Sequence, residues 1–288
     1  MIINMLDFPI IDTHVHLWDP ERFRMSWLDN AEILNRRYAL PEYHQYTQGV
    51  EIEGMVYVEV DIDPHYTLIE PRWVAEQATQ DPRLRGIVAY APVENGERIR
   101  AYLDELVSIT SLVKGVRRLL QAESDNAYCL RPDFIRGVQI LAEYGLSFDI
   151  GIRHVQLESV VELVRRCPDT AFILDHIGKP DVKGQLLDPW RQHIDALAAQ
   201  PNVVCKISGM ATEADPEHWT IKDLAPYVSH VIAAFGEDRI LYGGDWPVAL
   251  QATSYPRWVE TLDTLTIQLS PEAKRKLWVD NARRFYRL

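Results

Sequence analysis

Cysteine is scarce in this chain, and its few cysteines are not spaced to bind a metal or to build a disulfide framework. Three occur among 288 residues, far apart in the sequence: Cys129, Cys167 and Cys205. An odd number of scattered cysteines is typical of proteins from a reducing compartment, where each thiol is buried as a small apolar group. The sequence therefore predicts free, buried cysteines and a cytoplasmic location.

Long apolar runs and an excess of basic residues are also missing. No stretch approaches the roughly 20 apolar residues of a membrane span. Asp7 and Asp12 interrupt the apolar N-terminal segment, which also lacks the basic residues that begin a signal peptide. The formal net charge is -12, and such a field repels polyphosphates and anionic membrane surfaces. We expect neither nucleic acid nor a membrane as a partner, which leaves small molecules.

Short apolar runs recur along the chain and alternate with segments of helical periodicity. The runs are apolar throughout, which is typical of a parallel sheet covered on both faces. Eight are predicted to be strands, the first beginning at residue 10 and the others at 54–60, 86–90, 112–117, 146–150, 171–175, 203–207 and 239–242. This alternation predicts one (β/α)8 barrel domain over residues 1–288.

Helix signals support this interpretation. Leu157, Val160, Val161 and Val164 recur at helical spacing, and Ser270 before a proline and an acid predicts a last helix that ends near residue 285. A doubly wound open sheet is the competing fold, but it usually has a glycine-rich first turn. This chain has His-Val-His at that point instead.

The connection after the first predicted strand is the longest, from residue 16 to about residue 54. It leaves the carboxyl end of a strand, so in a barrel it is expected to lie over the mouth of the site. We expect its aromatic residues to cover a ligand, to anchor the loop, or to do both. These residues are Trp18, Phe23, Trp27, Tyr38, Tyr43 and Tyr46.

Polar residues gather at the predicted carboxyl ends of the strands, where (β/α)8 barrels carry their active sites. His14 and His16 are two residues apart, so one strand face can present both rings. The later strand ends supply Glu59, Asp61, Arg117, Arg118, His154, Asp175, His176, Lys206, Ser208 and Asp245.

Three histidines and an aspartate among these residues predict either of two sites. His14, His16, His176 and Asp245 suit a divalent metal such as zinc, which lowers the pKa of bound water. The same residues can act without a metal, with Asp245 as general base and the histidines polarising a carbonyl oxygen. The sequence does not choose between them.

Five segments together resemble the amidohydrolase superfamily, and within it the sugar-lactone hydrolases related to L-fuconolactonase and L-rhamnonolactonase. The segments are Ile-Asp-Thr-His-Val-His-Leu-Trp-Asp-Pro (11–20), Gly-Val-Arg-Arg (115–118), Asp-His-Ile-Gly-Lys-Pro (175–180), Cys-Lys-Ile-Ser-Gly (205–209) and Tyr-Gly-Gly-Asp-Trp-Pro-Val (242–248). The resemblance spans nearly the whole chain. It implies a distorted (β/α)8 barrel that hydrolyses a lactone.

The resemblance also implies roles for single residues. His14 and His16 correspond to the histidine pair of strand one, His176 to the strand-six histidine, and Asp245 to the aspartate that activates water. Binuclear members of the superfamily carry a carboxylated lysine at the end of strand four, where this chain has Arg117. We therefore expect no two-metal site, and either no cofactor or one weakly bound zinc.

Substrate contacts are expected around this centre. Acidic groups at one side of the mouth, including Glu59, suit the hydroxyl groups of a sugar, and three tryptophans can stack on its ring: Trp18, Trp27 and Trp246. Arg117 is expected either to bind substrate or to pair with a buried carboxylate. His154 is expected to contact substrate or to cap the following helix.

These residues favour hydrolysis of a neutral sugar lactone such as L-fuconolactone. A pyrone dicarboxylate would need several arginines, and only Arg117, Arg118 and Arg153 are candidates. A zinc-dependent decarboxylase of an aromatic acid is the second alternative, and a ligand-binding barrel without turnover is the third. The oligomeric state is not indicated.

Overall fold

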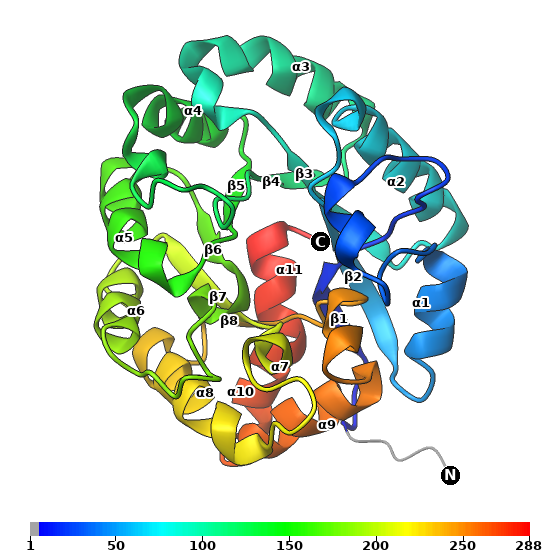
Figure 1. Ribbon diagram of the computed structural model, residues 1–288, viewed down its shortest axis with the longest axis vertical. Coiled ribbons are helices and arrows are strands. Elements are labelled where there is room, and N and C mark those ends of the chain that lie inside the picture. Colours follow the sequence, from blue (N-terminus) through cyan, green and yellow to red (C-terminus); the bar gives the residue numbers. More distant parts are fainter. Residues whose placement is uncertain (1–5) are drawn as a thin grey trace.

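Eight parallel strands follow one another around a barrel in sequence order in the computed structural model, which describes residues 6–288 (Figure 1). They are β1 Ile10–Val15, β2 Ile52–Val58, β3 Leu84–Tyr90, β4 Val113–Arg117, β5 Ser147–Ile150, β6 Phe172–Leu174, β7 Val203–Ile207 and β8 Ile240–Tyr242. Each strand pairs with the next in parallel. The predicted (β/α)8 barrel is confirmed.

The seam between β1 and β8 is closed by residues just beyond β8. A single bridge joins Val15 to Trp246. The backbone N–H of Asp245 donates to the carbonyl of His14, and that of His16 to the carbonyl of Trp246, both at 2.8 Å. This irregular closure distorts the barrel, and it places Asp245 beside the two histidines.

Helices surround the strands on the outside of the barrel (Figure 1). The α-helices before the C-terminal helix are α1 Leu40–Tyr46, α2 Ile69–Gln80, α3 Ile99–Ile109, α4 Pro132–Glu143, α5 Leu157–Arg166, α6 Trp190–Ala198, α7 Met210–Glu213, α8 Ile221–Phe235 and α9 Tyr255–Leu265. Short 3-10 helices cover Ser26–Asn30, Pro64–Tyr66, Val93–Arg98, Tyr128–Leu130, His154–Gln156, Asp175–Gly178 and Val248–Gln251. Helix α5 buries all four residues whose spacing predicted it.

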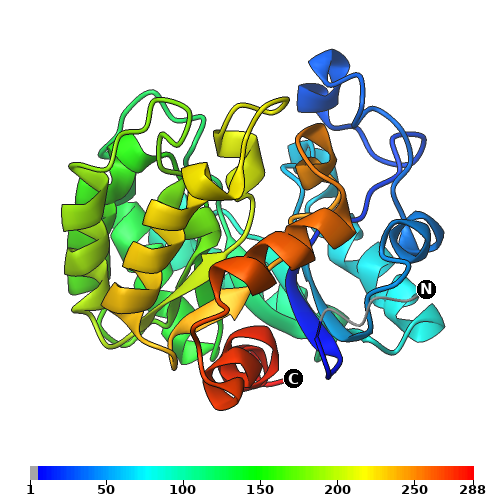
Figure 2. The ribbon, with the colours of Figure 1, turned by 90° about the horizontal axis from the view of Figure 1, so that it is seen from below.

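The predicted C-terminal helix forms, with a π-helical segment in its middle. It consists of α10 Pro271–Arg275, the π-helix Lys276–Asp280 and α11 Asn281–Tyr286. The Ser270 hydroxyl accepts from the N–H of Ala273 at 3.1 Å, which confirms the predicted N-cap. This helix lies on the opposite side of the barrel from the long first loop (Figure 2).

The long first loop is a packed structure. Trp18 and Tyr38 form an antiparallel bridge, and their rings meet edge to face at 5.4 Å. Both rings are buried. The aromatic residues of the loop therefore anchor it.

The cysteine prediction is confirmed, because all three cysteines are buried and free. In the chain from residue 6 onward, no helix combines the length and the apolar character needed to cross a membrane.

Candidate active site

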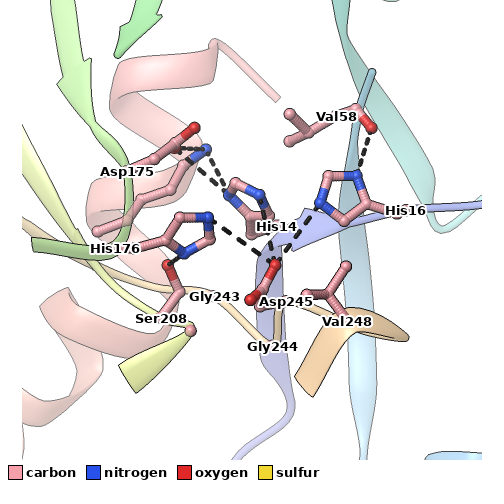
Figure 3. Close-up of polar contacts among 12 residues, drawn as sticks. His14, His16, Val58, Asp175, His176, Ser208, Gly243, Gly244, Asp245 and Val248 are labelled. Carbon is pink, nitrogen blue, oxygen red and sulfur yellow. Dashed lines mark hydrogen bonds and ion pairs between the residues drawn. The ribbon is translucent and has the colours of Figure 1, made fainter. Parts of the chain in front are cut away.

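Three imidazole rings converge on one carboxylate oxygen (Figure 3). The Nε2 atoms of His14, His16 and His176 lie 3.8, 3.6 and 3.9 Å from Oδ1 of Asp245. All four side chains are buried. β1 supplies His14, and His16 follows the strand directly. His176 lies two residues beyond the end of β6, and Asp245 lies three residues beyond the end of β8. The structure thus brings together the four residues predicted to form the catalytic centre.

Hydrogen bonds on the outer side of two rings set their orientation. Nδ1 of His16 lies 2.7 Å from the carbonyl oxygen of Val58, which can only accept, so Nδ1 carries the proton. In the neutral ring, Nε2 then directs a lone pair at the Asp245 carboxylate. Nδ1 of His176 lies 2.9 Å from the Ser208 hydroxyl. Such outer partners are typical of histidines that hold a metal through the opposite nitrogen.

Burial controls the protonation of the site. Burial lowers the pKa of His176 to about 4, and it lowers that of His14 well below its usual value, against the pull of Asp175. For Asp245, burial acts upward, but the neighbouring histidines hold its pKa well below the usual 3.8. At neutral pH the imidazoles of His14 and His176 are therefore neutral, and the carboxylate of Asp245 is ionised.

This donor set fits one divalent metal such as zinc. Ligand atoms of His14, His16 and Asp245 all lie within 4.8 Å of one another, and zinc accepts imidazole nitrogen and carboxylate oxygen. A lone pair on His16 Nε2 that faces an anionic oxygen is repulsive unless a cation or a proton lies between them. His14, His16 and Asp245 can therefore hold a metal together, and His176 lies beside them with its Nε2 3.9 Å from Asp245.

Arg117, at the end of β4, takes part in a buried ion-pair network below the centre. Its Nε donates to Oε1 of Glu59 at 2.6 Å, and its NH1 group lies 3.3 Å from Asp175 and 3.4 Å from Nε2 of His14. Lys206 lies 3.0 Å from Asp175 and 3.4 Å from Nδ1 of His14. A guanidinium thus occupies the position where a second metal would need a ligand.

A cavity of about 340 Å³ opens above the centre. Six residues predicted for the site line it: His16, Trp18, Trp27, Arg117, His176 and Asp245. His14 is completely buried and is not among the lining residues. The cavity thus joins the catalytic centre to two tryptophans of the long first loop.

Three residues predicted to bind substrate are not among those that line the cavity. Glu59 is buried against Arg117, and the fully buried ring of Trp246 packs at 5.3 Å against Tyr38. His154 directs Nδ1 at the carbonyl oxygen of Lys179, at 3.2 Å. Arg117 is paired with buried carboxylates, as one of its two expectations stated, and it also lines the cavity.

The sequence interpretation missed several polar residues of the site. Gln121, Lys179 and Gln251 line the cavity. Lys179 belongs to the segment Asp-His-Ile-Gly-Lys-Pro but was not predicted as a site residue, and no quoted segment contains Gln121 or Gln251. Asp12 lies beneath the centre, where Oδ1 accepts from the N–H groups of His14 and Gly244 at 3.0 and 2.7 Å. The sequence contained a signal for the role of Asp12, because it is an acid inside an otherwise apolar strand, and a buried carboxylate needs hydrogen-bond donors around it.

Gly209 keeps open the space that two catalytic side chains occupy. Its φ is +61°, and a Cβ atom there would lie 2.5 Å from Nδ1 of His176 and 2.7 Å from Oδ2 of Asp245. Both distances are far below van der Waals contact. The sequence Ser-Gly after β7 thus allows β6 and β8 to bring their side chains together.

A (β/α)8 barrel that gathers three histidines and an aspartate at the carboxyl ends of its strands defines a hydrolytic barrel enzyme. The chain belongs to the amidohydrolase family, whose sequence pattern matches residues 11–288.

Named relatives and a solved structure match almost the full chain. An L-fucono-1,5-lactonase of Burkholderia ambifaria is 31% identical, over 96% of this chain and 95% of the relative. One of Burkholderia multivorans is 29% identical, over 96% of each chain. The crystal structure of a Burkholderia multivorans amidohydrolase with bound zinc superimposes with a TM-score of 0.88 at 28% identity, over 98% of this chain and 100% of the other.

Proposed function

We propose that this hydrolase opens the ring of a neutral sugar lactone, such as L-fuconolactone, to give the aldonic acid. The observation that carries the proposal is the convergence of three imidazole rings on the carboxylate of Asp245 at a cavity. The lactonase names of the two Burkholderia relatives support it. An aldonolactone substrate would place the enzyme in carbohydrate metabolism, and the cytoplasmic location stays a prediction.

Asp245 is the general base in this proposal. Its carboxylate takes a proton from water while the water oxygen forms a bond to the lactone carbonyl carbon. The carbonyl oxygen gains negative charge in the resulting tetrahedral intermediate. When the bond from that carbon to the ring oxygen breaks, the ring oxygen takes the proton from Asp245. The product is a hydroxy acid, which releases its acidic proton at neutral pH.

The histidines orient the reacting groups. His16 and His176 are fixed from behind by Val58 and Ser208, so their Nε2 atoms stay directed at the reaction centre. A zinc ion held by these rings, His14 and Asp245 would supply Lewis-acid stabilisation of the developing oxyanion. The buried, paired Arg117 adds positive charge below His14 without a free side chain.

The charges around the cavity favour a neutral substrate. Arg117 is the one arginine among the lining residues of the described chain, and carboxylates occupy it already. Arg118 pairs with Glu94 and Glu123. Arg153 is not among the lining residues, and its Nε donates to the backbone carbonyl of Gln121 at 3.3 Å. A dicarboxylate would therefore find no arginine cluster. Trp18 and Trp27 meet edge to face at 5.4 Å and offer an apolar wall to a sugar ring.

A proton-release assay tests the proposal. The substrates are a panel of sugar aldonolactones, a pyrone dicarboxylate and an aromatic lactone, together with carbon dioxide detection on an aromatic acid, each with and without chelator. Hydrolysis of an aldonolactone above the others is expected. Turnover of the dicarboxylate or the aromatic acid instead would overturn the proposal. Activity that chelator abolishes and zinc restores would assign a metal, and unchanged activity would assign catalysis to the side chains alone.

A further inference from the structure

We infer that Lys179 binds the carboxylate that lactone hydrolysis creates, and that it stabilises the negative charge developing on the carbonyl oxygen beforehand. The inference rests on the proposed lactone hydrolysis and adds to it a binding residue for the product. It follows from the hydrogen bonds that Lys179 leaves unused, from the backbone that positions it, and from the balance of charge in the cavity.

Lys179 is the cavity cation with unused donors. Two lysine or arginine side chains line the cavity in the part of the chain that the structure describes, Lys179 and Arg117. Arg117 directs its donors at Glu59 and Asp175. Lys179 Nζ donates to the neutral amide oxygen of Gln121 at 2.8 Å and lies 3.8 Å from Glu213, beyond hydrogen-bond distance. An ammonium group has three N–H bonds, so two remain for a ligand.

An unusual backbone turn carries Lys179 into the cavity. Residues 176–179 all have positive φ, at 52°, 49°, 73° and 46°. Only one of them is a glycine, and the left-handed conformation is unfavourable for the other three. Consecutive residues in this region persist where surrounding contacts enforce them, and they concentrate at functional sites. His176 and Lys179, at the two ends of this turn, both line the cavity.

Neighbouring side chains enforce the turn. The indole N–H of Trp190 donates to the carbonyl of Ile177 at 2.8 Å, and Nδ1 of His154 lies 3.2 Å from the carbonyl of Lys179. The N–H of Lys179 donates to the carbonyl of His176 at 2.9 Å. His154, which was expected to bind substrate or cap a helix, therefore acts here as a positioning residue for Lys179.

The reaction supplies an anion for Lys179. A neutral lactone carries no charge, whereas ring opening and loss of the acidic proton leave one carboxylate in the cavity. One ammonium group with two free N–H bonds matches the two oxygens of one carboxylate. It can also interact with the carbonyl oxygen as that atom becomes anionic in the transition state.

A binding cycle tests this inference. Titration calorimetry would compare L-fuconate with L-fucitol, which keeps the hydroxyl groups but has no carboxylate. The ratio of the two dissociation constants, fucitol over fuconate, is expected to fall about 10- to 100-fold in Lys179→Met, because a charge-assisted hydrogen bond is lost. Lys179→Arg should retain most of the ratio. On the lactone, Lys179→Met should lower kcat.

Lys183→Met is the matched control, because its side chain is 68% exposed and does not line the cavity. Its ratio should equal that of the unchanged enzyme. A ratio in Lys179→Met within twofold of the unchanged enzyme overturns the inference, as does failure of the unchanged enzyme to bind either ligand. The proposed function fails on a separate result, which is that the unchanged enzyme hydrolyses no lactone.

Discussion

Replacement of Asp12 by asparagine should change how the stability of the protein depends on pH. Asp12 is completely buried between β1 and the loop after β8. Its Oδ1 accepts from two backbone N–H groups, and Oδ2 accepts from the hydroxyls of Tyr43 and Tyr255 at 3.2 and 2.9 Å. Asparagine keeps the Oδ1 bonds, and the tyrosine hydroxyls can turn to accept from its amide. The substitution therefore removes the charge and retains the shape.

The expected magnitude follows from the pKa of Asp12. Burial raises this pKa from 3.8 to about 6, although the four hydrogen bonds oppose the rise. An acid whose pKa is higher in the folded state favours folding when protonated, so its contribution falls as pH rises from about 4 to about 6. A pKa shift of about two units at ~1.36 kcal/mol per unit changes the contribution of Asp12 to the free energy of unfolding by about 3 kcal/mol in total. About 2 kcal/mol of this contribution is lost between pH 4.5 and 7.5.

Urea unfolding of both proteins at pH 4.5 and 7.5 measures this effect. Asp12→Asn should gain about 2 kcal/mol relative to the unchanged protein between the two pH values. The comparison isolates Asp12, because His176 and every other titrating group are common to both proteins. Asp169→Asn, at an exposed position before β6, is the control and should show no such gain. Parallel pH dependences for Asp12→Asn and the unchanged protein would refute the reasoning.

Three further predictions concern the catalytic centre. Asp245→Asn should lower kcat by about 10²- to 10⁴-fold in the proton-release assay with the fold retained, because it removes the general base. Asp63→Asn, outside the cavity, is its control. If Asp245→Asn kept more than about a tenth of the original activity, the role assigned to Asp245 would be contradicted. The acid limb of kcat/KM should fall as pH approaches about 4, where His176 gains its proton, and activity that declines with a midpoint near 6.5 would show an ordinary histidine instead. Gly209→Ala should lower kcat more than tenfold, whereas Gly145→Ala, which has a similar φ of +65° but open space around it, should lower stability alone; equal kinetics in the two variants would exclude the predicted collision with His176.

Much of the fold was predictable because strands and helices each bury apolar residues that recur at a characteristic spacing in the sequence. Apolar runs of strand length and the spacing of Leu157, Val160 and Val164 depend only on neighbours in the sequence, and the eight strands and α5 formed as predicted. The order of the motifs was also sufficient to gather His14, His16, His176 and Asp245, because parallel strands in a barrel all end on the same side.

The second layer of the site was not predictable in this way. Trp246 was expected to stack on a ligand, but it packs into the buried aromatic cluster beneath the first loop, since the seam of the barrel turns its backbone there. Lys179 belongs to one of the five family segments, but nothing in that segment predicts that its side chain lines the cavity. Only the left-handed turn, stabilised by side chains distant in sequence, brings it to the wall.

The sequence by itself determined the barrel, the family resemblance and the four residues that we propose as the catalytic centre. Each of these depends on local periodicity or on the carboxyl ends of strands. The tertiary structure decided which charges are already paired and which face the cavity, because those contacts join residues from different loops. Arg117 lies 58 positions from Glu59, with which it pairs, and Lys179 lies 58 positions from Gln121. No local pattern encodes such distances, so the partner of each charge, and with it the two unused N–H donors of Lys179, became visible only in the folded chain.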